Sequence, residues 1–223
     1  MAEYSHLSEL DSEFAPYVTQ LNSAPRLPED DMDWTYDENN SIDGRTGISI
    51  VNVEYRLAPE HPHPIGLNDS YSALKWVSNI VDRPLSGQIL QVACFVHPNA
   101  VPDKYKPSLL SFEQIKDAPL LNAETALWCA GQLDGSPTGP EVSPLLYLSY
   151  AGLAPVVNQV CGLDLLRDEA FLYEKLLRNE GVRTKITVCP GVPHGFRYLF
   201  PAIKLGVEDY LSGLRWSLNG APQ

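Results

Sequence analysis

Alternation of apolar, β-branched runs with segments of helical periodicity is the feature that most constrains the fold of this chain. The runs expected to form strands cover residues 48–55, 88–96, 154–162 and 183–190. Helices are expected at residues 69–80, 122–132, 168–181 and 202–216. In the helical segments apolar residues recur at spacings of three and four. Because strands that alternate with helices pair in parallel, the sequence predicts an α/β protein whose mostly parallel sheet is flanked by helices.

The first 47 residues are expected to form an arm outside this sheet. One amphipathic helix is predicted from the apolar residues Leu7, Leu10, Phe14, Val18 and Leu21. An acidic stretch rich in turn-forming residues follows and is typical of a linker. We therefore expect a helical arm and acidic linker at residues 1–47 and a single α/β domain at residues 48–223.

Charge and hydropathy exclude several classes of partner. The chain carries 28 acidic and 16 basic residues, a net charge of −12, which argues against nucleic acid or an anionic membrane surface. It contains no apolar run of 18 residues, so no membrane span is predicted. The first residues lack the basic start and apolar stretch of a signal peptide, which favours a cytoplasmic protein. The oligomeric state is left open.

The cysteines do not indicate a metal or redox site. The four of them, Cys94, Cys129, Cys161 and Cys189, include no pair with C-x-x-C spacing. Cys94, Cys161 and Cys189 lie in or beside apolar strand-like runs, so buried, reduced thiols are expected there. We expect neither a metal nor a cofactor.

Asp164 and His194 are the strongest candidates for chemistry. Each follows a predicted strand, and ligands of open α/β sheets bind beyond the carboxyl ends of the strands. A carboxylate there can hold an imidazole in one tautomer and prepare it as a general base. Two structural alternatives stand beside this interpretation. A histidine in a Pro/Gly loop is often a surface residue, and Asp164 could simply begin a helix together with Asp168 and Glu169.

Three segments resemble the hormone-sensitive-lipase branch of the α/β hydrolases, a family of carboxylesterases. They are YRLAPEHPHP at residues 55–64, DLLRDE at residues 164–169 and PGVPHGF at residues 190–196. Two positions depart from the family pattern, with His63 in place of Phe and Leu165 in place of Pro. The resemblance implies that Asp164 is the acid of a catalytic triad, that His194 is its base, and that the ligand is a small ester or an acyl or aromatic compound.

Two elements of that family are missing from the sequence. No G-x-S-x-G nucleophile elbow occurs, and no H-G-G-G loop precedes the first predicted strand. Only residues 78–87 join the helix at 69–80 to the strand at 88–96, whereas a strand and a helix alone need about 5 and about 11 residues. We therefore expect a reduced α/β-hydrolase fold without its central nucleophile strand, in which the strands at 48–55 and 88–96 pair directly. An exon missed in a gene prediction would leave the same pattern.

No serine of the chain replaces the missing nucleophile convincingly. The candidates are Ser86, Ser136, Ser143 and Ser149. None of them is flanked by a strand-to-helix elbow, so no nucleophile is assigned. Three interpretations stay open: a carboxylic-ester hydrolase that is impaired or inactive, a non-catalytic pseudo-hydrolase that binds a small molecule, and a dehydratase or cyclase that uses the His194–Asp164 pair.

Overall fold

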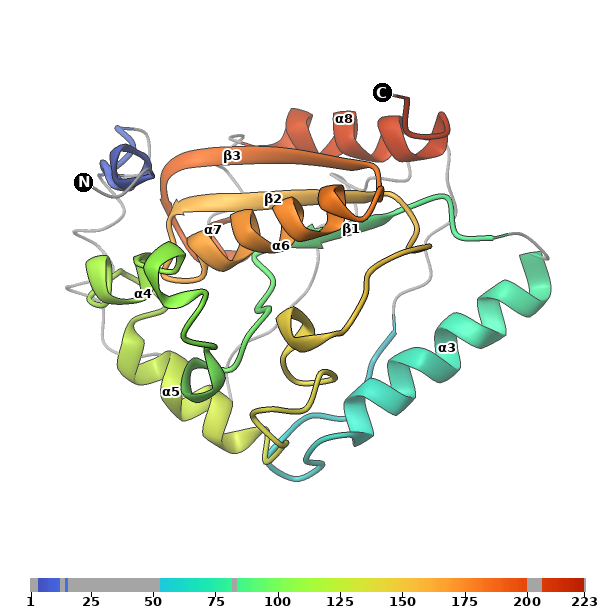
Figure 1. Ribbon diagram of the computed structural model, residues 1–223, viewed down its shortest axis with the longest axis horizontal. Coiled ribbons are helices and arrows are strands. Elements are labelled where there is room, and N and C mark those ends of the chain that lie inside the picture. The colour runs from blue at the N-terminus through green and yellow to red at the C-terminus, as the bar shows by residue number, and fades with distance from the viewer. Residues whose placement is uncertain (1–3, 13–14, 16–52, 82–83, 200–205, 223) are drawn as a thin grey trace.

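A three-stranded parallel sheet forms the centre of the part of the molecule that the structure describes (Figure 1). The computed structural model describes residues 4–12, 15, 53–81, 84–199 and 206–222. The strands β1 (Gln88–Gln91), β2 (Val156–Leu163) and β3 (Thr184–Pro193) lie side by side in that order. The parallel sheet with helices packed on it agrees with the α/β class that the sequence predicts. The expected domain boundary at residue 47 lies outside the described residues, so it stays a prediction.

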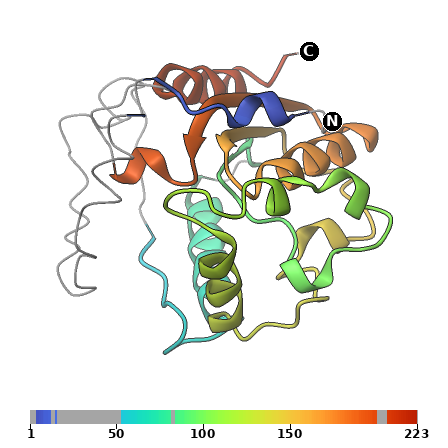
Figure 2. The same cartoon turned by 90° about the vertical axis from the view of Figure 1, so that its left-hand side faces the viewer.

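The two faces of β2 are covered by different helices, α6 (Arg167–Asn179) and α8 (Val207–Leu218) (Figure 2). Asn158 faces α6, and its side-chain amide donates a hydrogen bond of 3.2 Å to the carbonyl of Ala170. The next residue, Gln159, faces the other way and donates a hydrogen bond of 2.8 Å to the carbonyl of Gly206 at the start of α8. Side chains alternate between the faces of a strand, so the apolar run of β2 is buried on both sides.

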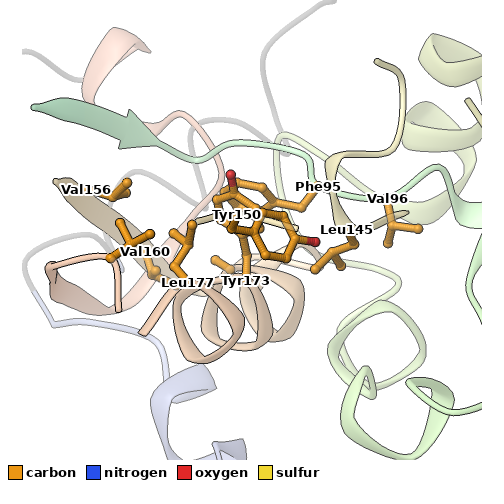
Figure 3. Packing of buried hydrophobic residues seen from close by; sticks show 10 residues of the cluster. Phe95, Val96, Leu145, Tyr150, Val156, Val160, Tyr173 and Leu177 are labelled. Atoms are coloured by element: carbon orange, nitrogen blue, oxygen red, sulfur yellow. The ribbon is translucent and has the colours of Figure 1, made fainter. Parts of the chain in front are cut away.

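The main hydrophobic core lies between the sheet and α6 (Figure 3). The ring of Tyr173 stacks on Phe95 with a centroid distance of 4.2 Å, and Tyr150 meets Tyr173 edge-on at 5.4 Å. Leu177 has no exposed surface. Residues far apart in the chain therefore converge on one face of α6, and this packing holds α6 against the sheet.

Two of the predicted strands differ from the structure. β1 ends at Gln91 instead of residue 96, because Val92 adopts a positive φ of 45° and leaves the extended conformation. Residues 48–52 lie outside the described residues, and residues 53–55 form no strand. The expected direct pairing of residues 48–55 with β1 is therefore not found in the part of the chain that the structure describes.

The helices follow the predicted periodicity with shifted ends. The longer ones outside the core are α3 (Ile65–Val81) and α5 (Ala123–Gln132). Short helices occupy Ser5–Ser8 (η1), Pro98–Ala100 (η4), Lys106–Ser108 (η5), Ser111–Gln114 (α4), Pro144–Leu146 (η6) and Phe196–Leu199 (α7). α3 begins four residues earlier than expected, directly after Pro64, where the missing N–H of proline costs a helix nothing. The predicted amphipathic helix of the arm is not formed at residues 9–12, where the amide of Asp11 bonds to Gly191 on β3 instead of to a helical turn. Most of the rest of that predicted helix lies outside the described residues.

The cysteines agree with the sequence only in part. All four are free thiols. Cys161 and Cys189 are buried register partners on β2 and β3, as expected. Cys94 is exposed, so the expectation of a buried thiol is wrong there, because β1 ends before it. Among the helices that the structure describes, none is long and apolar enough to cross a bilayer.

The start of α5 provides a test of local stability. The side-chain oxygen of Asn122 accepts a hydrogen bond of 2.8 Å from the amide of Thr125, as expected for an N-cap residue. We expect Asn122→Ala to lower the free energy of unfolding by about 1 kcal/mol, because one amide at the helix start loses its acceptor. Asn122→Asp keeps an acceptor and should be nearly neutral in urea unfolding. Equal losses in both variants would contradict this role for the cap.

Candidate acid–base site

Asp164 and His194 meet at the carboxyl edge of the sheet. Asp164 is the first residue after β2, and His194 is the first residue after β3. Because β2 and β3 are parallel neighbours, their carboxyl ends bring the two side chains together. His194 Nδ1 lies 2.9 Å from Asp164 Oδ2, and the side chains are 27% and 3% exposed, respectively. The sequence predicted both residues and their proximity.

The Asp164 carboxylate is held in place from both sides. Its second oxygen, Oδ1, accepts a hydrogen bond of 2.9 Å from the amide of Leu166. The backbone carbonyl of Asp164 accepts a hydrogen bond of 3.0 Å from the amide of Arg167 at the start of α6. A carboxylate is only an acceptor, so Nδ1 of His194 is assigned the proton and Nε2 is left as the basic nitrogen. This arrangement can take a proton from a hydroxyl or from water.

Glu169 is a buried carboxyl group near the pair that sequence reasoning missed as a site residue. Its Oε2 accepts hydrogen bonds of 2.8 and 2.7 Å from the amides of Phe95 and Val96. Burial raises the pKa of Glu169 to about 8, the two amides oppose that rise, and the charge of Asp164 adds to it. Glu169 thus accepts hydrogen bonds from two backbone amides that would have bonded within the sheet if β1 had continued to residue 96.

Asp168 and Arg167 form a buried ion pair beside the site. Arg167 Nε lies 2.9 Å from Asp168 Oδ1, and their side chains are 0% and 3% exposed. Asp168 Oδ2 also accepts hydrogen bonds of 2.9 and 2.8 Å from the amides of Leu110 and Ser111. The sequence suggested that Asp168 and Glu169 begin the helix. They do lie in its first turn, but their carboxylates bind loops from elsewhere in the chain, which no local pattern indicates.

Three of the four candidate serines form hydrogen bonds with residues other than His194. Ser143 has no exposed surface, and its hydroxyl donates to the carbonyl of Pro137 at 2.6 Å while accepting from the amide of His97 at 2.9 Å. Ser149 donates to Glu180 Oε2 at 2.6 Å, and Ser136 lies 3.4 Å from Thr138 Oγ1. None of these hydrogen bonds, drawn from the described residues, joins a serine to His194.

Ser86 lies at the opposite end of the sheet. It precedes β1, whose first residue, Gln88, is in register with Val156. Asp164 follows Val156 by eight residues, which in a strand span about 26 Å. The hydroxyl of Ser86 is therefore far out of reach of the imidazole.

A hollow in the described part of the molecule lies away from the pair. It has a volume of about 400 Å³ and is lined by Pro84, Leu85, Gln88, Gly152, Leu153 and Ala154. These residues lie at the amino ends of β1 and β2, opposite Asp164. In the described part of the chain, no group of three or more His, Cys, Asp and Glu side chains could hold a metal ion.

Several known proteins are similar to this chain in sequence or in structure. The chain is 27% identical over 78% of its length to an AB hydrolase superfamily protein of Schizosaccharomyces pombe, covering 62% of that protein. It is 28% identical over 76% of its length to the versiconal hemiacetal acetate esterase of Dothistroma septosporum, covering 64% of it. The crystal structure of vibralactone cyclase is similar with a TM-score of 0.72 and 33% identity, over 76% of this chain and 62% of that one.

The chain spans less than two thirds of the length of each of these relatives. A family model described as the alpha/beta hydrolase fold matches it in two pieces, residues 31–88 and 80–198. The second piece covers the three described strands and both loops that carry Asp164 and His194. The chain belongs to the α/β-hydrolase family.

Proposed function

We propose that this chain is a carboxylic-ester hydrolase by descent that keeps the acid–base half of the catalytic site and lacks the nucleophile, so that hydrolysis is impaired. One observation carries the proposal: His194 is hydrogen-bonded to Asp164 at 2.9 Å, while each candidate serine is engaged elsewhere or lies at the far end of the sheet. Relatives named as esterases support an ester as the substrate class.

Two further observations support the loss of an internal block between α3 and β1. The family match is interrupted there, because its first piece ends at residue 88 and its second piece begins at residue 80. α3 also exposes an apolar stripe at helical spacing, with Leu67 44%, Tyr71 57% and Leu74 41% exposed. A stripe of this kind normally packs against a neighbouring layer. Finding a G-D-S-A-G-G reading frame in the genomic DNA between the codons of residues 78 and 88 would identify the block as a missed exon.

The remaining residues can still support slow chemistry. In the complete mechanism a serine attacks the ester carbonyl, the histidine accepts the serine proton, and the aspartate stabilises the imidazolium. Without a serine, Nε2 of His194 can accept a proton from water as the water oxygen bonds to the carbonyl carbon. The imidazolium then returns the proton to the leaving alcohol as its C–O bond breaks. General-base assistance of this kind is worth about 10²–10⁴-fold.

The test is hydrolysis of p-nitrophenyl acetate by the purified 223-residue chain. We expect a slow rate that falls by about 10²-fold in His194→Ala, because the general base is lost. The serine variants Ser86→Ala, Ser136→Ala and Ser149→Ala should keep the parent rate. A fluorophosphonate probe should leave the chain unlabelled.

Two results would overturn the proposal. One is covalent labelling of a serine by the fluorophosphonate. The other is a hydrolysis rate that is abolished by replacing a single serine while the protein stays folded. Either result would establish a working nucleophile. Saturable binding of an acyl or aromatic ligand without any turnover would instead favour the non-catalytic pseudo-hydrolase.

A second candidate is a cyclase or dehydratase that uses the pair only for proton transfer. The likeness to vibralactone cyclase, at 33% identity, favours it. Such an enzyme needs a positioned base and acid but no covalent nucleophile, which matches the residues present. Turnover of a β-hydroxy ketone that disappears in His194→Ala, together with no ester hydrolysis, would favour this candidate over the first.

A further inference from the structure

Residues 4–12 form an N-terminal strap across the carboxyl ends of β2 and β3 (Figure 1). The amide of Asp11 donates a hydrogen bond of 3.0 Å to the carbonyl of Gly191 on β3. The hydroxyl of Ser8 lies 3.4 Å from the carbonyl of Gly162 on β2. The strap therefore contacts the two strands at the ends that carry the candidate site.

The strap lies directly against the backbone of the two strands. A methyl group added to Gly162 would overlap with the carbonyl oxygen of Leu7, and one added to Gly191 would overlap with the carbonyl oxygen of Glu9. Gly162 precedes Asp164 by two residues, and Gly191 precedes His194 by three. Both glycines are thus required for a close approach beside the two site residues.

Ser8 links the strap to both ends of the turn that contains Asp164. The Nη1 atom of Arg167 donates hydrogen bonds of 2.6 Å to Ser8 Oγ and 3.2 Å to the carbonyl of Gly162. The Ser8 hydroxyl accepts from Arg167 and donates to Gly162. One hydroxyl therefore connects the residue two places before Asp164 with the residue three places after it.

We propose that Ser8 is a positioning residue for the Asp164–His194 pair. Through Arg167 and Gly162, it fixes the turn from which the Asp164 carboxylate reaches His194. The chemical role of that pair rests on the proposed function, but the positioning itself is a property of the folded chain. Loss of the Ser8 hydroxyl loosens the turn and weakens the hydrogen bond between Asp164 and the imidazole.

The experiment is NMR on the full chain with two matched serine variants. Ser8→Ala removes the link, and Ser5→Ala makes the same change at an exposed position of the same helix η1. Exchange of the Asp11 amide with water reports whether the strap is docked on Gly191. Exchange of the His194 Nδ1 proton reports the hydrogen bond to Asp164. We expect both protons to exchange about fivefold faster in Ser8→Ala, as the loss of one hydrogen bond implies, and at the parent rate in Ser5→Ala.

A double variant makes the test decisive. The Tyr4 ring stacks on Phe171 with a centroid distance of 4.1 Å, so Tyr4→Ala together with Ser8→Ala removes two side-chain attachments of the strap. The positioning role would be overturned if the Asp11 amide exchanged freely with water in the double variant while the exchange rate of the His194 Nδ1 proton stayed at the parent value. Undiminished protection of the Asp11 amide in the double variant would also overturn it, because Ser8 would then not hold the strap. Neither readout needs ester turnover, so failure of the proposed function leaves this result distinct.

Discussion

Arg167→Ala is expected to lower the free energy of unfolding by about 3–5 kcal/mol, because it leaves a buried carboxylate without its cation. The Arg167 side chain has no exposed surface and contacts Asp168 at 2.9 Å. Asp168 also holds the amides of Leu110 and Ser111, so its charge stays buried after the substitution. Urea unfolding followed by circular dichroism measures the loss.

Arg178→Ala is the matched control on the same helix. Arg178 is 65% exposed and lies 3.3 Å from Glu174, an ion pair of a kind that contributes at most about 1 kcal/mol. The two substitutions remove the same group from α6 but differ in burial. Equal losses for Arg167→Ala and Arg178→Ala would show that burial of the Arg167–Asp168 pair has no special energetic role.

Glu169→Gln is expected to remove a pH dependence of stability. The pKa of Glu169 is raised from 4.5 to about 8 in the folded chain, chiefly by burial. A carboxyl group with a raised folded pKa gives a stability contribution that is complete below pH 4.5 and is lost as the pH rises through about 8. The full loss corresponds to up to about 5 kcal/mol. Glutamine keeps an oxygen for the amides of Phe95 and Val96 but has no proton to lose.

The measurement is urea unfolding from pH 5 to pH 9. The parent chain should become less stable from pH 5 to about pH 8 and then level off, while Glu169→Gln keeps its stability and exceeds the parent at pH 9. Asp164 and the Cys94 thiol are the ionisable groups that interact with Glu169, so both stay unchanged in the comparison. Parallel pH profiles for the two proteins would contradict a buried, neutral Glu169.

Glu180→Gln provides a control of opposite sign. Glu180 also accepts amide hydrogen bonds, from Tyr150 and Ala151, but it is exposed. Hydrogen bonds from the Ser149 hydroxyl and from these amides lower its pKa. A lowered pKa gives a contribution that is present above the unfolded pKa and lost as the pH falls. Glu180→Gln should therefore lose stability at neutral pH, where Glu169→Gln does not.

The proximity of Asp164 and His194 could be predicted from the sequence for a simple physical reason. Asp164 and His194 each follow an apolar run directly, and parallel neighbouring strands must bring such residues to one edge. The apolar run wrongly predicts a strand at residues 92–96, because the run continues after β1 has ended. There the amides of Phe95 and Val96 bind Glu169, a residue more than seventy positions away, and the strand ends early.

The sequence by itself determined the α/β class, much of the helix and strand pattern and the proximity of Asp164 and His194, because periodicity and strand ends are local properties. Tertiary structure alone decided that Arg167, Asp168 and Glu169 are buried anchors rather than the solvated start of a helix. It also decided that the Ser8 hydroxyl meets Arg167 from 159 residues away. Burial and partners of a charged side chain depend on what packs over it, and that is set only when the whole chain is folded.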